Sequence, residues 1–262
     1  MDFGIAGRQA VICAASSGLG FACAAALAAE GVNITINARQ EDKLYEAICR
    51  LKDINSKVQV TGIAGDISCL EVQLAILAAT PVVDILVTNA GGPPIGYDTD
   101  WTREIWLTAI ETNMLTPIAL IQAVLEKMKN RRFGRIVNIT SGSIKAPRNS
   151  LSLSNAARGG LTTYISGLAK SSELAGKNVT INNLLPGAFA TQRLIQTFAN
   201  EASLCGKLAE NIAIERINTI PAGRLGAPEE FGAYCAFLCS ANAGYITGQN
   251  ILIDGGAFSG VF

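Results

Sequence analysis

The residues best suited to chemistry lie in one segment, residues 134–158, which reads GRIVNITSGSIKAPRNSLSLSNAAR. It begins as an apolar run typical of a buried strand that ends at Ser141, and it closes on a helix start that carries Ser154 and Arg158. Residues four apart share one face of a helix, so Ser154 and Arg158 are expected to point the same way. Two hydroxyls and a permanent cation can together stabilise the negative charge that develops on an oxygen atom during a reaction.

The chain contains no histidine. Ser-His-Asp and Cys-His nucleophilic sites are therefore excluded, and the commonest general acid and metal ligand is missing. Acid-base chemistry must use tyrosine, lysine, carboxylates, hydroxyls or water. The seven cysteines form no Cys-x-x-Cys pair, so we expect them to be reduced, buried, small apolar residues of a cytoplasmic protein without a metal site.

Composition limits the classes of protein that the chain can belong to. It has 262 residues, 49% of them hydrophobic, and 21 basic residues balance 21 acidic ones. This length and apolar content suit a single domain over residues 1–262. The absence of a basic block argues against nucleic acid as a partner. The absence of an apolar run of 18 residues argues against a membrane span, and the N-terminal segment does not resemble a secretory signal.

Short apolar runs alternate with amphipathic stretches along the chain, which predicts an α/β fold with a Rossmann-type, doubly wound parallel sheet of about seven strands and helices on both faces. The expected strands are residues 10–14, 33–38, 57–64, 82–88, 135–140, 179–184 and 250–253. The expected helices are residues 19–30, 41–52, 70–79, 103–129, 152–175 and 228–239. Ligands of such sheets bind at the carboxyl ends of the strands. Residues 190–225 have no clear place in the sheet and are predicted to form an irregular substrate lid.

The loop after the first expected strand is suited to a nucleotide. It runs from Ala14 through Ser16, Ser17, Gly18 and Leu19 to Gly20 and opens directly into a helix. The first glycine lets the backbone approach a pyrophosphate, and the second allows a helix to pack closely on a strand. The helix N-terminus presents free N–H groups to phosphates, and the two serines add hydroxyl donors.

The end of the second expected strand indicates which nucleotide is bound. An acidic residue at this point would hydrogen-bond the ribose of NAD, but the chain has Arg39 instead. An arginine can pair with the 2′-phosphate of NADP. We therefore favour NADP, with NAD as the other possibility.

Several motifs, in order from Gly7 to Gly256, resemble the short-chain dehydrogenase/reductase family, and 3-oxoacyl-acyl-carrier-protein reductases in particular. The matching segments are the glycine-rich loop (with Ala14 at its first glycine), Asp66 with Ile67, Thr88-Asn89-Ala90-Gly91, Asn113, Ser141, Pro186-Gly187 with Thr191, and residues 245–256. The resemblance implies that the loop, Asp66, Ile67, Asn89, Ala90, Gly91, Pro186, Gly187 and Thr191 bind the coenzyme. It also implies that Asn113 holds a water of a proton relay and that Ser141 is catalytic.

The chain departs from this family at two positions. Thirteen residues after Ser141, the position of the family's catalytic tyrosine holds Ser154, and four residues later Arg158 replaces the lysine. A serine hydroxyl is a much weaker acid than a phenol, and arginine cannot relay a proton. Arg158 can still hydrogen-bond the nicotinamide ribose, so we place it in both the catalytic and the coenzyme-binding sets. Lys145 is a weaker candidate for a replacement acid, and Tyr97 is a candidate to line the pocket.

Three functions fit this pattern. The favoured one is an NAD(P)-dependent oxidoreductase that acts on a small carbonyl or alcohol substrate with a non-standard proton donor. The second is a nucleotide-binding sensor or catalytically weak partner subunit. The third is a non-redox lyase similar to halohydrin dehalogenases, which also carry arginine at the lysine position but have lost the nucleotide loop.

The resemblance further implies a homotetramer or homodimer that assembles through its two long central helices.

Overall fold

Seven parallel strands form the centre of the structure, a computed structural model that describes residues 2–261 apart from the side chain of Leu204. Their order across the sheet is β3-β2-β1-β4-β5-β6-β7, and every neighbouring pair is parallel. The strands are β1 (Gln9–Ile12), β2 (Asn33–Ala38), β3 (Val60–Ala64), β4 (Ile85–Thr88), β5 (Gly134–Ile139), β6 (Val179–Pro186) and β7 (Asn250–Ile253). The predicted doubly wound parallel sheet is confirmed.

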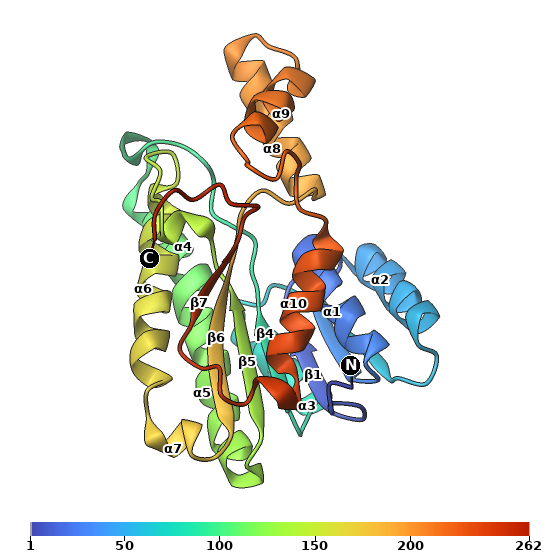
Figure 1. Cartoon of the computed structure of the whole chain (residues 1–262). Helices are drawn as coiled ribbons and strands as arrows, with labels where there is room; N and C mark the ends of the chain where they lie inside the picture. The colour runs from blue at the N-terminus through green and yellow to red at the C-terminus, as the bar shows by residue number, and fades with distance from the viewer. Residues whose placement is uncertain (1, 262) are drawn as a thin grey trace.

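Helices connect the strands and cover both faces of the sheet (Figure 1). They are α1 (Gly18–Ala29), α2 (Glu41–Ile54), α3 (Leu70–Ala79), α4 (Arg103–Ile110), α5 (Thr116–Arg131), α6 (Ser152–Leu168), α7 (Ser172–Ala175), α8 (Gln192–Cys205), α9 (Ala209–Asn218) and α10 (Pro228–Cys239). Two separate hydrophobic clusters result. One lies under α1, α2 and α10, and the other lies under α3, α5 and α6.

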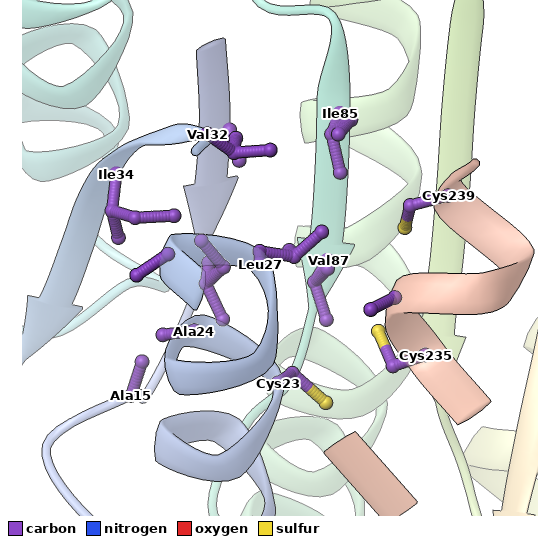
Figure 2. Close-up of a cluster of buried hydrophobic side chains, with 14 of the residues drawn as sticks. Ala15, Cys23, Ala24, Leu27, Val32, Ile34, Ile85, Val87, Cys235 and Cys239 are labelled. Carbon is purple, nitrogen blue, oxygen red and sulfur yellow. The ribbon is translucent and has the colours of Figure 1, made fainter. Parts of the chain in front are cut away.

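The alternation of side chains along a strand produces this division. In β1, Ala10 and Ile12 belong to the first cluster, whereas Val11 and the following Cys13 belong to the second. Figure 2 shows part of the first cluster, in which Cys23 of α1 lies beside Cys235 of α10, and Cys239 follows one helical turn later. These cysteines pack as buried apolar residues, as expected.

Three other cysteines contradict the expectation that all are buried. Cys49, Cys69 and Cys205 are exposed. Cys49 is on the outer side of α2, Cys69 is the N-cap of α3, and Cys205 ends α8. Composition suggests burial of cysteine on average, but the position of each residue on its helix decides it.

Two predicted segments differ most from the structure. The helix expected over residues 152–175 ends at Leu168, because Ser171 caps a new helix, α7, by accepting a hydrogen bond from the N–H of Glu173 at 3.3 Å. Residues 190–225 are not irregular: they contain α8 and α9, whose contact is made by Phe198, Ala202 and Ile212. This helical pair projects beyond the carboxyl ends of the strands (Figure 1).

One helical stretch, Arg103–Arg131, is long and apolar enough by composition to cross a membrane, although 39% of its most apolar window is buried inside the structure. It comprises α4, a π-helical turn at Glu111–Leu115 and α5. The buried side chains of α5, including Leu120, Val124 and Met128, pack in the second cluster. Packing on the sheet therefore accounts for part of its apolar character.

Candidate functional site

The glycine-rich loop lies where β1 and β4 are neighbours and the chain connections leave in opposite directions, which is the crevice in which open α/β sheets bind ligands. Ala14 has φ 48°, a left-handed conformation that normally calls for glycine. Gly18 is also left-handed, with φ 58°. A Cβ on Gly20 would lie 2.5 Å from the carbonyl oxygen of Ala14, so only glycine fits there. The loop therefore presents backbone to the crevice, with Ser16 and Ser17 beside it.

Asn89, which follows β4, contacts the glycine-rich loop. The Asn89 side-chain amide donates to the carbonyl oxygen of Ala14 at 3.3 Å. Asn89 also faces the Gly20 backbone, because a Cβ there would lie 2.9 Å from its amide nitrogen. Ala90 and Gly91 continue from it toward the surface. The structure thus brings the predicted residues of the first and fourth strands together.

A carboxylate lies at the other end of the crevice, after β3. Asp66 accepts hydrogen bonds from the backbone N–H of Ser68 at 2.9 Å and from its hydroxyl at 2.7 Å. These bonds, and to a smaller degree the positive charge of Arg39, lower the pKa of Asp66 below its usual value. Arg39 is exposed at the end of β2, while Ile67 is buried in the second cluster. Arg39 and Asp66 are thus close enough to act on one ligand.

Ser141 follows β5 and is oriented by a neighbour that the sequence analysis missed. The N–H of Ser143 donates to the Ser141 Oγ at 3.1 Å, and the two hydroxyl oxygens are 2.8 Å apart. When the Ser143 hydroxyl donates within this pair, the Ser141 proton is free for another acceptor. The Ser-x-Ser spacing was the signal available in the sequence.

Ser154 and Arg158 lie on the same side of α6, as predicted. Ser154 is 6% exposed, and its buried Oγ has no hydrogen-bond partner among the described residues. Arg158 is half-buried, and within residues 2–261 no acceptor is in hydrogen-bonding range of its guanidinium. The surrounding protein atoms, and then the positive charge of Arg193, lower the pKa of Arg158 to about 10. Two adjacent polar groups without protein partners indicate a place for a ligand.

Asn113 approaches this helix from a distorted element. It is the central residue of the π-helical turn and is 4% exposed. The next residue, Met114, packs on Gly160 of α6, where a Cβ would lie 2.8 Å from its sulfur. Such π-helical turns frequently occur at functional sites. No pattern in the sequence predicts this distortion, which places Asn113 next to the helix that carries Ser154 and Arg158.

The last predicted segment closes the crevice opposite α6. Gly187 follows β6 and packs against Asp254, where a Cβ would lie 2.6 Å from its Cα. Thr191 caps α8 and faces the phosphate loop, since a Cβ on Gly18 would lie 3.6 Å from its methyl group. Pro186 comes just before and is half-buried. The segment Pro186–Thr191 therefore leads from the sheet to the phosphate loop and then into the helical pair.

The loop between Pro93 and Trp101, the mouth loop, lies at the entrance to the crevice. The Gly96 N–H donates to the Ser150 carbonyl at 3.0 Å, and the Trp101 indole donates to the Ser152 hydroxyl at 3.0 Å. The loop is thus fastened to the start of α6, next to Ser154. Tyr97 is 61% exposed. Lys145 is 6.0 Å from the ring centre of Phe258.

No group of three or more Cys, Asp or Glu side chains in residues 2–261 is arranged to hold a metal ion. The arrangement instead combines a phosphate-sized backbone cradle with two hydroxyls and a cation. Such a site can hold an anionic dinucleotide and stabilise negative charge on a reacting oxygen.

Comparison with known proteins places this arrangement in a wider group. Residues 13–257 match the family model described as enoyl-(acyl carrier protein) reductase. The chain is 31% identical over 260 residues to the human dehydrogenase/reductase SDR family member 4, covering 96% of this chain and 88% of the relative. It is 32% identical over 254 residues to the 3-oxoacyl-[acyl-carrier-protein] reductase of Vibrio cholerae, covering 96% and 98%.

Solved structures agree over the full length. The L-sorbose reductase of Gluconobacter frateurii, solved with NADPH and L-sorbose, has a TM-score of 0.92 at 29% identity and covers 100% of both chains. YwfH, an NADPH-dependent reductase involved in bacilysin biosynthesis, has a TM-score of 0.91 at 28% identity, covering 98% of this chain and 100% of that one.

Proposed function

Because the chain belongs to the short-chain dehydrogenase/reductase family, we propose that it transfers a hydride between NADP(H) and a carbonyl or alcohol group of a small molecule, with a proton donor other than tyrosine. Family membership confirms the predicted general class, an NAD(P)-dependent oxidoreductase. The single observation that carries the finer proposal is the buried Ser154 hydroxyl, which has no partner among the described residues and lies one helical turn before Arg158 on α6.

The residues of the crevice fit a dinucleotide. Gly20 leaves no room for a side chain, Gly18 has a left-handed φ of 58°, and Ser17 at the N-cap of α1 makes no capping bond with its hydroxyl. We assign the pyrophosphate to the glycine-rich loop, the adenine end to Arg39 and Asp66, and the nicotinamide end to the remaining predicted residues, namely Asn89, Ala90, Gly91, Arg158, Pro186, Gly187 and Thr191. Bound there, the coenzyme supplies the hydride.

NADP is preferred over NAD in this proposal. Arg39 offers a bidentate partner for a 2′-phosphate, and Asp66, rather than an acid at the end of β2, is the nearby carboxylate. The solved relatives named above are described with NADPH. A lower dissociation constant for NADPH than for NADH in direct titration supports this preference.

We propose that Ser154 and Arg158 occupy the positions of the family's tyrosine and lysine. In the reducing direction, the carbonyl carbon gains a hydride and its oxygen becomes an alkoxide. Ser141 and Ser154 donate hydrogen bonds to that oxygen, and the charge of Arg158 stabilises it. The alkoxide then takes its proton from water that exchanges with the solvent, directly or relayed through a serine hydroxyl, because arginine does not exchange protons at neutral pH. Asn113, beside α6, is suited to hold such a water.

The second candidate is a nucleotide-binding sensor or weakly active partner subunit, which the same two substitutions favour. A positioned acid typically contributes about 10²–10⁴ in rate, so its loss leaves a slow enzyme or none. The lyase alternative is the weakest, because the nucleotide loop is intact. The lid at residues 190–225, the cytoplasmic location and the homo-oligomer remain predictions.

The experiment is a titration with NADPH followed by turnover. We expect quenching or a shift of NADPH fluorescence on binding, and oxidation of NADPH with members of a panel of ketones, diketones and 3-oxoacyl thioesters. Ser141→Ala is expected to lower kcat at least tenfold, while Ser172→Ala, an exposed serine of α7, leaves it unchanged. Binding without turnover supports the sensor, and an unchanged rate in Ser141→Ala removes this hydroxyl from the mechanism.

A further inference from the structure

Arg193, near the start of α8, reaches from the helical pair back to the sheet. Its guanidinium donates to the Pro93 carbonyl at 3.4 Å, a contact between residues 100 positions apart. The guanidinium also lies directly on Gly92, because a Cβ there would collide with Nη2 and lie 2.9 Å from Cζ. Because Gly92 has no side chain, the Arg193 guanidinium fits against the segment that joins β4 to the mouth loop.

The Arg193 side chain points in a different direction from the side chain of Thr191, two residues before it. Thr191 faces Gly18 on the phosphate side, whereas Arg193 faces Gly92 and Pro93 on the mouth side. The mouth loop is fastened to Ser150 and Ser152, immediately before Ser154. Arg193 therefore lies on the substrate side of the crevice rather than over the phosphate loop.

No carboxylate of residues 2–261 forms a salt bridge with Arg193 or Arg158. The two cations are nevertheless close enough for the charge of Arg193 to lower the pKa of Arg158. Burial also lowers the pKa of Arg193 itself. Two like charges in a partly desolvated site repel each other unless an anion joins them.

A second pair of arginines has one member after β5 and one on the helical pair. Arg148 lies in the loop after Ser141, and its pKa is lowered by burial and then by the positive charge of Arg216 on α9, with Glu201 of α8 acting in the opposite direction. Arg148 and Arg216 thus add positive charge between the loop after Ser141 and the helical pair, although the whole chain has no net charge.

We propose that the substrate carries a carboxylate, which Arg193 binds across Gly92 while the reacting carbon lies over Ser141 and Ser154. This inference rests on the proposed function and names its substrate class, an oxo acid or hydroxy acid. Arg193 would pair with the carboxylate in a bidentate manner, and Arg158 and Arg148 would add attraction. Binding would draw the start of α8 against the mouth loop and remove water from the site.

The first test compares a matched pair of substrates, 2-oxo-4-phenylbutanoate and its ethyl ester, with NADPH as the coenzyme. The wild-type protein is expected to reduce the acid at least thirtyfold more efficiently, by kcat/KM, than the ester. Arg193→Met is expected to lower kcat/KM for the acid at least thirtyfold, mainly through KM, and to change that for the ester less than threefold. Arg193→Lys is expected to fall between them, and Lys52→Met, an exposed cation on α2, serves as the control.

The second test measures binding without chemistry. Phenylacetate is titrated into the protein saturated with NADP⁺, and its dissociation constant is expected to rise at least tenfold in Arg193→Met. The NADPH dissociation constant of the same variant is expected to stay within threefold of the wild-type value.

The results of these tests distinguish carboxylate binding by Arg193 from the proposed oxidoreductase function. If the NADPH dissociation constant rises at least tenfold in Arg193→Met, this arginine binds a coenzyme phosphate and the inference is overturned. A wild-type preference for the ester, or no phenylacetate binding to the NADP⁺ complex, also overturns it while leaving the proposed oxidoreductase intact. Failure to bind NADPH at all overturns the proposed function instead.

Discussion

Two buried or half-buried arginines, Arg135 and Arg158, lie at opposite ends of the sheet and differ in their surroundings. Arg135 belongs to the start of β5 and is 1% exposed, and Arg158 belongs to α6 near the carboxyl ends of the strands. Burial is the main cause that lowers the pKa of each to about 10. The perturbed pKa therefore does not distinguish them.

Their hydrogen bonds do distinguish them. The Arg135 guanidinium donates to the carbonyl oxygens of Ser240 at 3.0 Å, Gly134 at 2.9 Å and Asn178 at 2.8 Å, and to the Asn178 side chain at 3.0 Å. It also lies 4.5 Å from the ring centre of Phe133. Arg158 has no such partners within residues 2–261. A buried cation whose donors are satisfied by the protein holds the fold together, and one whose donors are not satisfied is available to a ligand.

The two arginines are expected to differ most in their contribution to the stability of the fold. Arg135→Met is expected to lower the free energy of unfolding by about 3 kcal/mol, because several buried carbonyl oxygens lose their donor. Arg158→Met is expected to change it by less than about 1 kcal/mol, since no protein hydrogen bond is lost. Urea denaturation of the two variants measures both values. Equal destabilisation would mean that Arg158 is as structural as Arg135.

The next effect concerns the pH dependence of turnover. Arg158, with a pKa of about 10, stays mostly protonated below pH 9, and a serine hydroxyl does not titrate in this range. We therefore expect log kcat/KM of the wild-type protein to be flat from pH 6 to 9 and to fall only as the pH approaches 10. Ser154→Tyr is expected to add a decrease above neutral pH of about tenfold, because a phenol must be protonated to donate and the adjacent cation lowers its pKa.

A stopped-flow or steady-state pH profile of both proteins checks this expectation, with Ser154→Ala as the control that keeps a flat profile. A decrease between pH 7 and 9 in the wild-type protein would point to a titrating acid that the proposal omits. Lys145 and Tyr97 would then be the candidates to mutate.

A smaller effect concerns the backbone of the phosphate loop. Ala14 adopts φ 48°, which costs an L-residue roughly 1–2 kcal/mol. Ala14→Gly removes this strain but gives the unfolded chain more freedom, so a net gain of about 0.5 kcal/mol is expected. Thermal denaturation measures the gain, and NADPH affinity is expected to remain within twofold. A loss of stability would show that the alanine methyl contributes packing that outweighs the strain.

Much of the fold could be predicted from local patterns. The strand Asn33–Ala38 and the helices Leu70–Ala79 and Pro228–Cys239 have the bounds that the sequence indicates. Apolar periodicity and glycine positions are properties of neighbouring residues, so they are visible without tertiary contacts. The break at Leu168 and the helices α8 and α9 were missed, because a serine cap and a small separate cluster give weak signals.

The candidate site, like the fold, could be predicted from the sequence only in part. Local patterns show which residues follow each strand, and parallel strands bring those residues to one edge. Three features come from long-range packing: Arg193 lies on Gly92 and Pro93, Asn113 belongs to a π-helical turn beside α6, and the Ser154 hydroxyl has no partner among the described residues. These facts depend on contacts between residues far apart in the chain, where side-chain packing and burial, rather than local preference, determine which polar groups are satisfied.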